Sequence, residues 1–164
     1  MLEESNNFIN QYYLSDLSIC DDLITLFENS KIKTPGEIGK GLDKTIKDSV
    51  DLVLRDTDIS QSKTLINYFE ELSKIVDLYK KKYKSCDTQV PAWGLEPVFR
   101  IQKYKPSQAF HGWHCEKGTV DTAIRHLVFM TYLNNVKKGG ETEWYYQKLK
   151  VKPEKGLTFI WSAD

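Results

Sequence analysis

The sequence predicts an α+β fold, with helices in the first half of the chain and strands in the second half. In the first half, apolar residues recur at intervals of three and four, the period of an amphipathic helix. Beyond Cys86 the chain changes to short runs of aromatic and β-branched residues separated by turn residues. Because helices come first and strands second, we expect the helices to support a sheet that forms a sandwich or barrel.

Two helices are expected in the first half. The first follows Ser15 and Asp16, both good N-cap residues, and continues to Asn29. The second follows the capping residues 58–61 and carries one apolar stripe with a charged opposite face. The stripe consists of Leu65, Phe69, Leu72, Val76, Tyr79 and Tyr83. A basic run at residues 80–84 ends this helix, where cations complement the negative end of the helix dipole.

The strands are expected mainly after Cys86. Proline and glycine disfavour regular structure across residues 32–47, and alternating apolar residues at 50–54 predict one short strand before the second helix. Four further β-type runs lie at residues 98–104, 127–133, 143–151 and 157–161. We therefore interpret residues 1–164 as one domain, with a helical support region at 1–90 and a β-barrel core at 95–164.

Composition and charge exclude several classes of partner. Lys plus Arg and Asp plus Glu each number 23, so no long-range field favours nucleic acid or an anionic membrane. The three cysteines are widely spaced and form no C-x-x-C pair, which argues against a disulfide framework. The sequence shows no signal peptide and no apolar run long enough to span a bilayer, so we expect a soluble, cytoplasmic protein.

The densest cluster of possible ligands lies at residues 110–116, Phe-His-Gly-Trp-His-Cys-Glu. On a strand, residues two apart point to the same face, so His114 and Glu116 could aim an imidazole and a carboxylate at one ion. His111 would point the other way. Two histidines and one carboxylate are a typical ligand set for Fe(II), with positions left open for a cosubstrate and O₂. On its own the H-x-E pattern is weak, because a polar pair at a strand end is commonly just solvated.

Several motifs in order resemble one family. They are Tyr104-Lys105-Pro106, Phe110 with His114-x-Glu116, Arg125 before the run 127–133, Gly139-Gly140-Glu141-Thr142, and Val151-x-Pro153-x-x-Gly156 before the run 157–161. In this order and spacing, residues 95–164 resemble the prolyl 4-hydroxylase-like Fe(II)- and 2-oxoglutarate-dependent oxygenases.

The resemblance implies a double-stranded β-helix, a jelly-roll-like barrel whose mouth holds the iron, buttressed by the N-terminal helices. It implies that His114 and Glu116 bind the metal and that Tyr104 and Thr142 contact 2-oxoglutarate. Tyr104 could equally be a core residue, and Thr142 could equally be a turn residue.

Three other side chains near these motifs have structural interpretations. Trp113 and Trp161 are expected to fill the barrel, because large aromatic side chains usually serve burial. His126 is expected to be satisfied by a hydrogen bond and not to bind a metal.

The chain departs from the family pattern in two ways. It has Glu116 where the family usually has Asp, so ligation needs a different rotamer or a backbone adjustment. The family's distal histidine and the basic residue that anchors 2-oxoglutarate follow the strand equivalent to 157–161, and no histidine follows His126. We therefore expect an incomplete site, C-terminally truncated relative to the family, with the last core strands missing and an unpaired sheet edge.

The resemblance implies a dioxygenase that hydroxylates a C–H bond while 2-oxoglutarate is converted to succinate and CO₂, with ascorbate as reductant. The substrate would be a peptide, a protein or a small molecule, with peptidyl proline first among them. One alternative is a non-catalytic barrel that acts as a binding module. A second is a zinc site formed by His111, His114 and Cys115, which strand geometry disfavours because the two histidines would face opposite ways.

Overall fold

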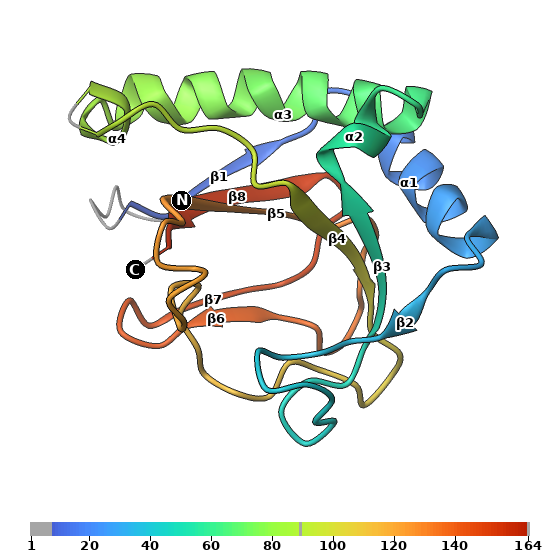
Figure 1. The fold of residues 1–164 in the computed structure, drawn as a ribbon. Coiled ribbons are helices and arrows are strands. Elements are labelled where there is room, and N and C mark those ends of the chain that lie inside the picture. Colours follow the sequence, from blue (N-terminus) through green and yellow to red (C-terminus); the bar gives the residue numbers. More distant parts are fainter. Residues whose placement is uncertain (1–7, 89, 164) are drawn as a thin grey trace.

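The structure is a computed structural model that describes residues 8–88 and 90–163 (Figure 1). It mixes helices with small antiparallel sheets, which confirms the α+β prediction. The helices are α1 (Ser18–Asn29), α2 (Asp56–Ile59), α3 (Lys63–Lys82) and α4 (Ser85–Thr88). The strands are β1 (Asn10–Tyr13), β2 (Thr34–Pro35), β3 (Val50–Arg55), β4 (Val98–Lys103), β5 (Leu127–Thr131), β6 (Thr142–Trp144), β7 (Leu149–Val151) and β8 (Leu157–Ser162).

The described strands form three antiparallel sheets, in the orders β1-β8-β5, β2-β3-β4 and β6-β7. In the first sheet, β8 is hydrogen-bonded on both sides, with Tyr12 opposite Thr158 and Thr131 also opposite Thr158. The unpaired edge expected beside the run 157–161 is therefore not found at β8. Strand β1 was not predicted, because its four residues, two of them tyrosines, are too few to show the alternation of apolar and polar residues that marks a strand.

Helix α3 lies along the sheet β1-β8-β5 (Figure 1). The helix is confirmed, but its predicted cap is wrong: residues 58 and 59 belong to α2, and the Ser62 side chain caps α3 by accepting a hydrogen bond from the Leu65 amide at 3.4 Å. Its apolar stripe is buried in the main core together with residues of α1 and β3. Among the residues that the structure describes, no helix has the length and apolar character needed to cross a membrane.

A charged residue of α3 also serves the fold. Glu71 accepts hydrogen bonds from the amide and hydroxyl of Ser15, at 3.0 and 2.5 Å, and it pairs with Lys74. The contact with Lys74 and then those with Ser15 lower the pKa of Glu71 to about 2. Glu71 therefore joins the segment before α1 to α3.

The two faces of β8 pack against different parts of the molecule. Ile160 is buried in the core beneath the helices, and the Thr158 hydroxyl joins Thr131, which bonds the hydroxyl of Tyr68 on α3. On the other face, Phe159 contacts the ring of Trp144 on β6, with centroids 5.2 Å apart. The sheet β1-β8-β5 therefore lies between the helical layer and the β6-β7 hairpin, as Figure 1 shows.

The segment before β3 holds the loop that carries the H-x-E motif. The Asp48 amide donates to the Ala109 carbonyl at 2.9 Å, and the His111 amide donates to the Ile46 carbonyl at 2.6 Å. Lys47 and Phe110 form an isolated antiparallel bridge between them. Backbone hydrogen bonds thus fix the loop that contains His114 to the segment just before β3.

Candidate metal and cosubstrate site

His114 and Glu116 lie in a loop and not on a strand, so the predicted local structure is wrong at this point. The two side chains are nevertheless together, because His114 Nε2 lies 3.6 Å from Glu116 Oε1. The loop achieves this through its turn at Glu116 and Lys117, and not through strand alternation.

The imidazole of His114 is held by two contacts. Its Nδ1 lies 2.9 Å from the Gly112 carbonyl oxygen, and since a carbonyl only accepts, Nδ1 carries the proton of this hydrogen bond. The ring also stacks on Phe110, with centroids 3.9 Å apart and planes 11° from parallel. In the neutral form Nε2 therefore bears a lone pair and faces the Glu116 carboxylate.

Glu116 is held by Arg125, which Glu96 holds in turn. Arg125 Nη1 donates to Glu116 Oε2 at 3.2 Å and to the Glu116 carbonyl at 3.3 Å. The Nε and Nη2 of Arg125 donate to the two carboxylate oxygens of Glu96, at 2.9 and 3.1 Å. Glu116 thus has one oxygen directed at His114 and the other bound to a guanidinium that is itself fixed in a bidentate pair.

These neighbours set the charge of the pair. Contact with His114, and next the charges of His114 and Arg125, lower the pKa of Glu116 against the effect of burial. The Glu116 carboxylate raises the pKa of His114. Glu116 is therefore an anion at neutral pH, as a metal ligand has to be.

The pair fits a divalent ion as two cis ligands. Ligand atoms about 2.1 Å from an ion and roughly at right angles are about 3 Å apart, so His114 Nε2 and Glu116 Oε1, 3.6 Å apart, would have to move slightly closer to bind one ion. Within residues 8–88 and 90–163, no group of three or more His, Cys, Asp or Glu side chains is placed to hold a metal. This holds for His111, His114 and Cys115 as well, so the zinc alternative finds no ligand group in the described part of the chain.

Tyr104 follows β4 directly, is 39% exposed, and is connected by hydrogen bonds to a buried ion pair. Its hydroxyl donates to Gln102 Oε1 at 3.2 Å, and Gln102 Nε2 donates to Asp51 Oδ2 at 3.2 Å. Asp51 is paired with Lys47 at 2.6 Å, and both side chains are buried. Burial, and next the Asp51 charge, raise the pKa of Tyr104 to about 12. Tyr104 is therefore a neutral hydrogen-bond donor at physiological pH.

This network extends toward His114. The Lys47 ammonium lies 5.9 Å from the ring centroid of Phe110, the residue that stacks on His114. Lys47 was not predicted as part of the site, because a lysine in an irregular segment rich in glycine resembles a solvated surface residue.

Thr142 lies at the start of β6 and forms hydrogen bonds with Tyr132, a residue that is not part of any of the motifs. The Tyr132 hydroxyl donates to Thr142 Oγ1 at 2.5 Å and accepts from the Thr142 amide at 3.1 Å. Glycines precede Thr142, and Gly139 and Gly140 have φ of +80° and +76°, which an L side chain rarely adopts. No hydrogen bond in the described residues joins Tyr104 or Thr142 to His114 or Glu116.

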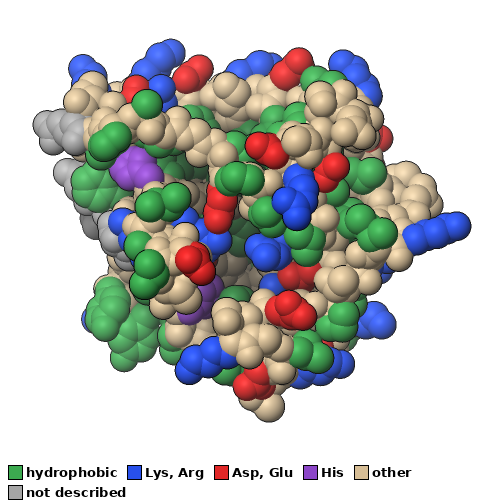
Figure 2. Space-filling model, viewed as in Figure 1, with side chains coloured by type: hydrophobic (Ala, Val, Ile, Leu, Met, Phe, Trp, Pro, Cys, Tyr) green, Lys and Arg blue, Asp and Glu red, His purple; other side chains and the backbone are tan. Residues whose placement is uncertain are grey.

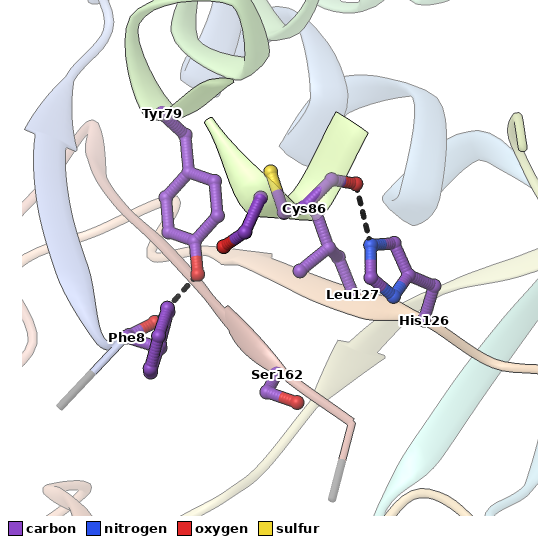
Figure 3. Close-up of a pocket in the computed structure, with 7 residues that line it drawn as sticks. Phe8, Tyr79, Cys86, His126, Leu127 and Ser162 are labelled. Atoms are coloured by element: carbon purple, nitrogen blue, oxygen red, sulfur yellow. Dashed lines mark hydrogen bonds between the residues drawn. The ribbon is translucent and has the colours of Figure 1, made fainter. Parts of the chain in front are cut away.

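His126 lies elsewhere, in a small pocket of about 180 Å³ that includes Tyr79, Cys86 and Ser162 (Figure 3). Its Nε2 lies 2.7 Å from the Cys86 carbonyl oxygen, as the dashed line in Figure 3 shows, and its ring contacts Trp93. This confirms that a hydrogen bond satisfies His126. It belongs to a different pocket from the one that would hold His114 and Glu116.

The two tryptophans expected to fill the barrel differ. Trp161 is largely buried and packs on Trp144, with ring centroids 5.4 Å apart. Trp113 is 63% exposed, so its interpretation as barrel filler is wrong. It contacts Tyr145, an exposed residue just after β6. Nothing in the local sequence indicated that Trp113 would be exposed while Trp161 would be buried.

Comparison with known proteins identifies the fold. The chain is similar to the viral collagen prolyl hydroxylase of Paramecium bursaria Chlorella virus-1 in complex with 2-oxoglutarate, with a TM-score of 0.64 and 20% identity over 96% of this chain and 78% of that one. It is also similar to a prolyl-4-hydroxylase of Pseudomonas putida, with a TM-score of 0.70 and 12% identity over 96% and 82% of the two chains. No protein-family model and no curated protein matches the sequence. The chain therefore has a prolyl 4-hydroxylase-like fold, which confirms the resemblance at the level of the fold.

Proposed function

We propose that this chain is a dioxygenase domain that uses Fe(II) and 2-oxoglutarate to hydroxylate a C–H bond. The observation that carries the proposal is the pairing of His114 Nε2 with Glu116 Oε1 at 3.6 Å, on a fold shared with prolyl hydroxylases. We further infer that the three small sheets are parts of a double-stranded β-helix. A peptidyl proline is the first candidate substrate, since both structural neighbours are prolyl hydroxylases.

The protein's contribution begins with the two ligands. The Gly112 carbonyl and the Phe110 ring orient His114 so that Nε2 is available, and Arg125 holds Glu116 so that one oxygen is available. These contacts place two cis donors and leave the remaining positions to a third donor, to the cosubstrate and to O₂. When bound, iron and 2-oxoglutarate supply the oxidising chemistry, and ascorbate serves as reductant.

The same proposal assigns Tyr104 and Thr142 to the cosubstrate. The Tyr104 hydroxyl stays protonated because burial raises its pKa, so it can donate a hydrogen bond to a carboxylate. The Thr142 hydroxyl would have to exchange its present contact with Tyr132 for one with the ligand. Tyr132 therefore joins Tyr104 and Thr142 as a residue expected to affect 2-oxoglutarate affinity.

A non-catalytic binding module is the second candidate. Two observations favour it: no group of three potential ligands is found among the described residues, and Arg125 already occupies one oxygen of Glu116. In that case the fold would be retained for recognition while the iron chemistry is absent.

An anaerobic titration separates the two candidates. Fe(II) and 2-oxoglutarate are added to the protein with and without imidazole, which can supply a nitrogen donor from solution, and the weak visible charge-transfer band of the chelate is recorded. The oxygenase proposal expects a band that His114→Ala abolishes. The matched control, His126→Ala, removes a histidine from the separate pocket and should leave the band unchanged. No band under any condition would refute the proposal and favour the binding module.

A further inference from the structure

The arginines of this chain are few and lie in one region of the fold. The sequence has 20 lysines but only three arginines, Arg55, Arg100 and Arg125. Arg125 is the residue whose guanidinium holds Glu96 and Glu116. Arg55 ends β3 and Arg100 lies in β4, and these two strands pair directly. Arginine, unlike lysine, presents a planar fork of donors that matches a carboxylate, so its restriction to this region indicates a role in carboxylate recognition.

Arg55 and Arg100 point to the same face of the β3-β4 sheet, the face turned away from the helices. Side chains alternate along a strand, and the leucines of β3 are buried in the core together with residues of α3. Arg55, which alternates with them, therefore points to the opposite face. Phe99 and Ile101 of β4 also pack against this core, which directs Arg100 to the opposite face as well.

The two arginines are diagonal neighbours on this face. Arg55 lies opposite Val98 and Arg100 lies opposite Val53, so the two are offset by two residues. Cα atoms of such diagonal neighbours are about 7–8 Å apart, so both long side chains can reach one ligand. Among the residues that the structure describes, no carboxylate pairs with either guanidinium. Like charges at this distance repel each other, and an anion bound between them removes the repulsion.

Strand β4 connects the two arginines with both parts of the candidate site. Glu96, which fixes Arg125 beside the metal ligand Glu116, lies two residues before β4. Tyr104, the residue assigned to the cosubstrate, follows the other end of β4. Figure 2 shows a hollow near the middle of the view, bordered by Lys or Arg side chains and by a histidine, and Figure 1 places β3 and β4 on one side of this region.

We propose that Arg55 and Arg100 bind a carboxylate of the substrate, so that the substrate is an acidic peptide; this proposal rests on the proposed function. The two guanidinium groups supply charge and forked donors from one face of the sheet, where a glutamate or aspartate side chain of a bound peptide can lie between them. The carboxylate then fixes the peptide relative to the metal ligands, because β4 is joined to Glu116 through Glu96 and Arg125.

The cosubstrate is too short to account for the pair. Val98, which lies opposite Arg55, is six residues from Tyr104, or about 20 Å along the strand, and side chains on one face of a strand stand roughly parallel. The carboxyl carbons of 2-oxoglutarate are at most about 5 Å apart, because four carbon–carbon bonds separate them. Hydrogen bonds add about 3 Å at each end. One molecule of 2-oxoglutarate therefore cannot contact both Tyr104 and Arg55, and the arginines are left to a second ligand.

The test uses the arginine Nε–H groups as reporters, in proton–nitrogen correlation NMR spectra of the isotope-labelled chain recorded without iron. Three arginines give three Nε–H signals, which single substitutions assign. The probe is acetyl-Glu-Pro-Glu-amide, and its uncharged counterpart acetyl-Gln-Pro-Gln-amide is the negative probe. We expect the acidic peptide to shift the signals of Arg55 and Arg100. The signal of Arg125 should stay in place, because its Nε is already bonded to Glu96.

The variants measure how much each arginine contributes. Arg55→Gln and Arg100→Gln should each weaken binding of the acidic peptide by about tenfold or more. Arg100→Lys keeps the charge but loses the fork, so its affinity should lie between those of Arg100→Gln and the unmodified chain. Lys81→Gln, which removes an exposed cation from α3, is the matched control and should bind as the unmodified chain does. The backbone amide signals of each variant show whether it folds.

The proposal is overturned if the acidic peptide shifts neither arginine signal, or if the glutamine peptide binds as tightly. It is also overturned if 2-oxoglutarate alone shifts both signals at lower concentration than the acidic peptide, because the pair would then serve the cosubstrate. The outcome is separate from that of the proposed function, since iron is absent. Acidic-peptide binding without a charge-transfer band would retain the arginine site and refute the oxygenase, whereas a band without acidic-peptide binding would refute the arginine site alone.

Discussion

Replacing Arg125 by glutamine tests whether the second carboxylate oxygen of Glu116 has to be held for a metal to bind. The substitution removes two hydrogen bonds to Glu116, at 3.2 and 3.3 Å, and leaves Glu96 without its bidentate partner. It also removes the positive charge that helps to lower the pKa of Glu116, so the carboxylate loses both orientation and electrostatic stabilisation. Glu116 has one more rotatable bond than the aspartate usual in the family, so its orientation depends more on such a partner.

The expected change in metal affinity follows from other metal sites in which a residue orients a ligand without binding the metal itself. Loss of a partner that orients a ligand lowers metal affinity by about 10–100-fold, or about 1.4–2.7 kcal/mol. We expect Arg125→Gln to raise the Kd for Co(II), used as a spectroscopic substitute for Fe(II), by this factor. Glu96→Gln should cause a smaller increase, because Arg125 still contacts Glu116. Co(II) absorption, recorded by titration, gives both the Kd and the coordination environment.

Arg100→Gln is the matched control, since Arg100 is an exposed arginine on β4. It should leave the Kd unchanged. Tighter Co(II) binding by Arg125→Gln would refute the reasoning, because it would mean that Arg125 competes with the metal for Glu116. An unchanged Kd would mean that Arg125 has no part in orienting the ligand.

Three further predictions concern stability, measured by chemical denaturation. Glu71→Gln should lower the free energy of unfolding by about 1–2 kcal/mol at neutral pH. Its lysine and serine partners lower the Glu71 pKa from 4.5 to about 2. The carboxylate therefore stabilises the fold above pH 4.5, and the difference in free energy of unfolding between the variant and the unmodified chain should disappear as pH falls toward 2. The control Glu70→Gln, at an exposed position, should show no such pH dependence. Lys47→Met leaves the buried Asp51 carboxylate without its cation and should lower the free energy of unfolding by about 3–5 kcal/mol. The double variant K47M/D51L should restore most of this loss, and no recovery would contradict a pairwise role. Phe159→Ala should lower the free energy of unfolding by about 3–5 kcal/mol and make the β6-β7 hairpin susceptible to protease. A hairpin as resistant to protease as in the unmodified chain would contradict the packing of Phe159 on Trp144.

Local sequence patterns predicted most of the regular elements. The stripe from Leu65 to Tyr83 predicted α3 because helical periodicity over many residues has few alternative explanations. The runs at 98–104, 127–133 and 157–161 correspond to β4, β5 and β8. The run at 143–151 is two short strands with a turn between them. It was predicted as one strand because the aromatic residues at 145 and 146, which lie in the turn, have high strand propensity.

The candidate site shows where such patterns fail. The spacing of His114 and Glu116 predicted that their side chains would be close together, which is correct, but a loop and not a strand places them there. The roles of Lys47 and Tyr132 depend on contacts with Phe110 and Thr142, which are not neighbours of theirs in sequence, and no local pattern records such contacts. The exposure of Trp113 follows from the position of the β6-β7 turn, which is a tertiary feature.

The position of β8 at the centre of its sheet has a consequence for biosynthesis. Within residues 8–88 and 90–163, β8 follows all other strands in sequence, and its neighbours are β1, which precedes them all, and β5. Until β8 leaves the ribosome, β1 and β5 have no partner in this sheet, and their backbone groups and apolar faces stay available to other chains. The long sequence separation between β1 and β8 also raises contact order, which slows folding. We therefore expect the sheet β1-β8-β5 to form only once β8 has emerged, with chaperones needed most while β5 is exposed and β8 is still being made.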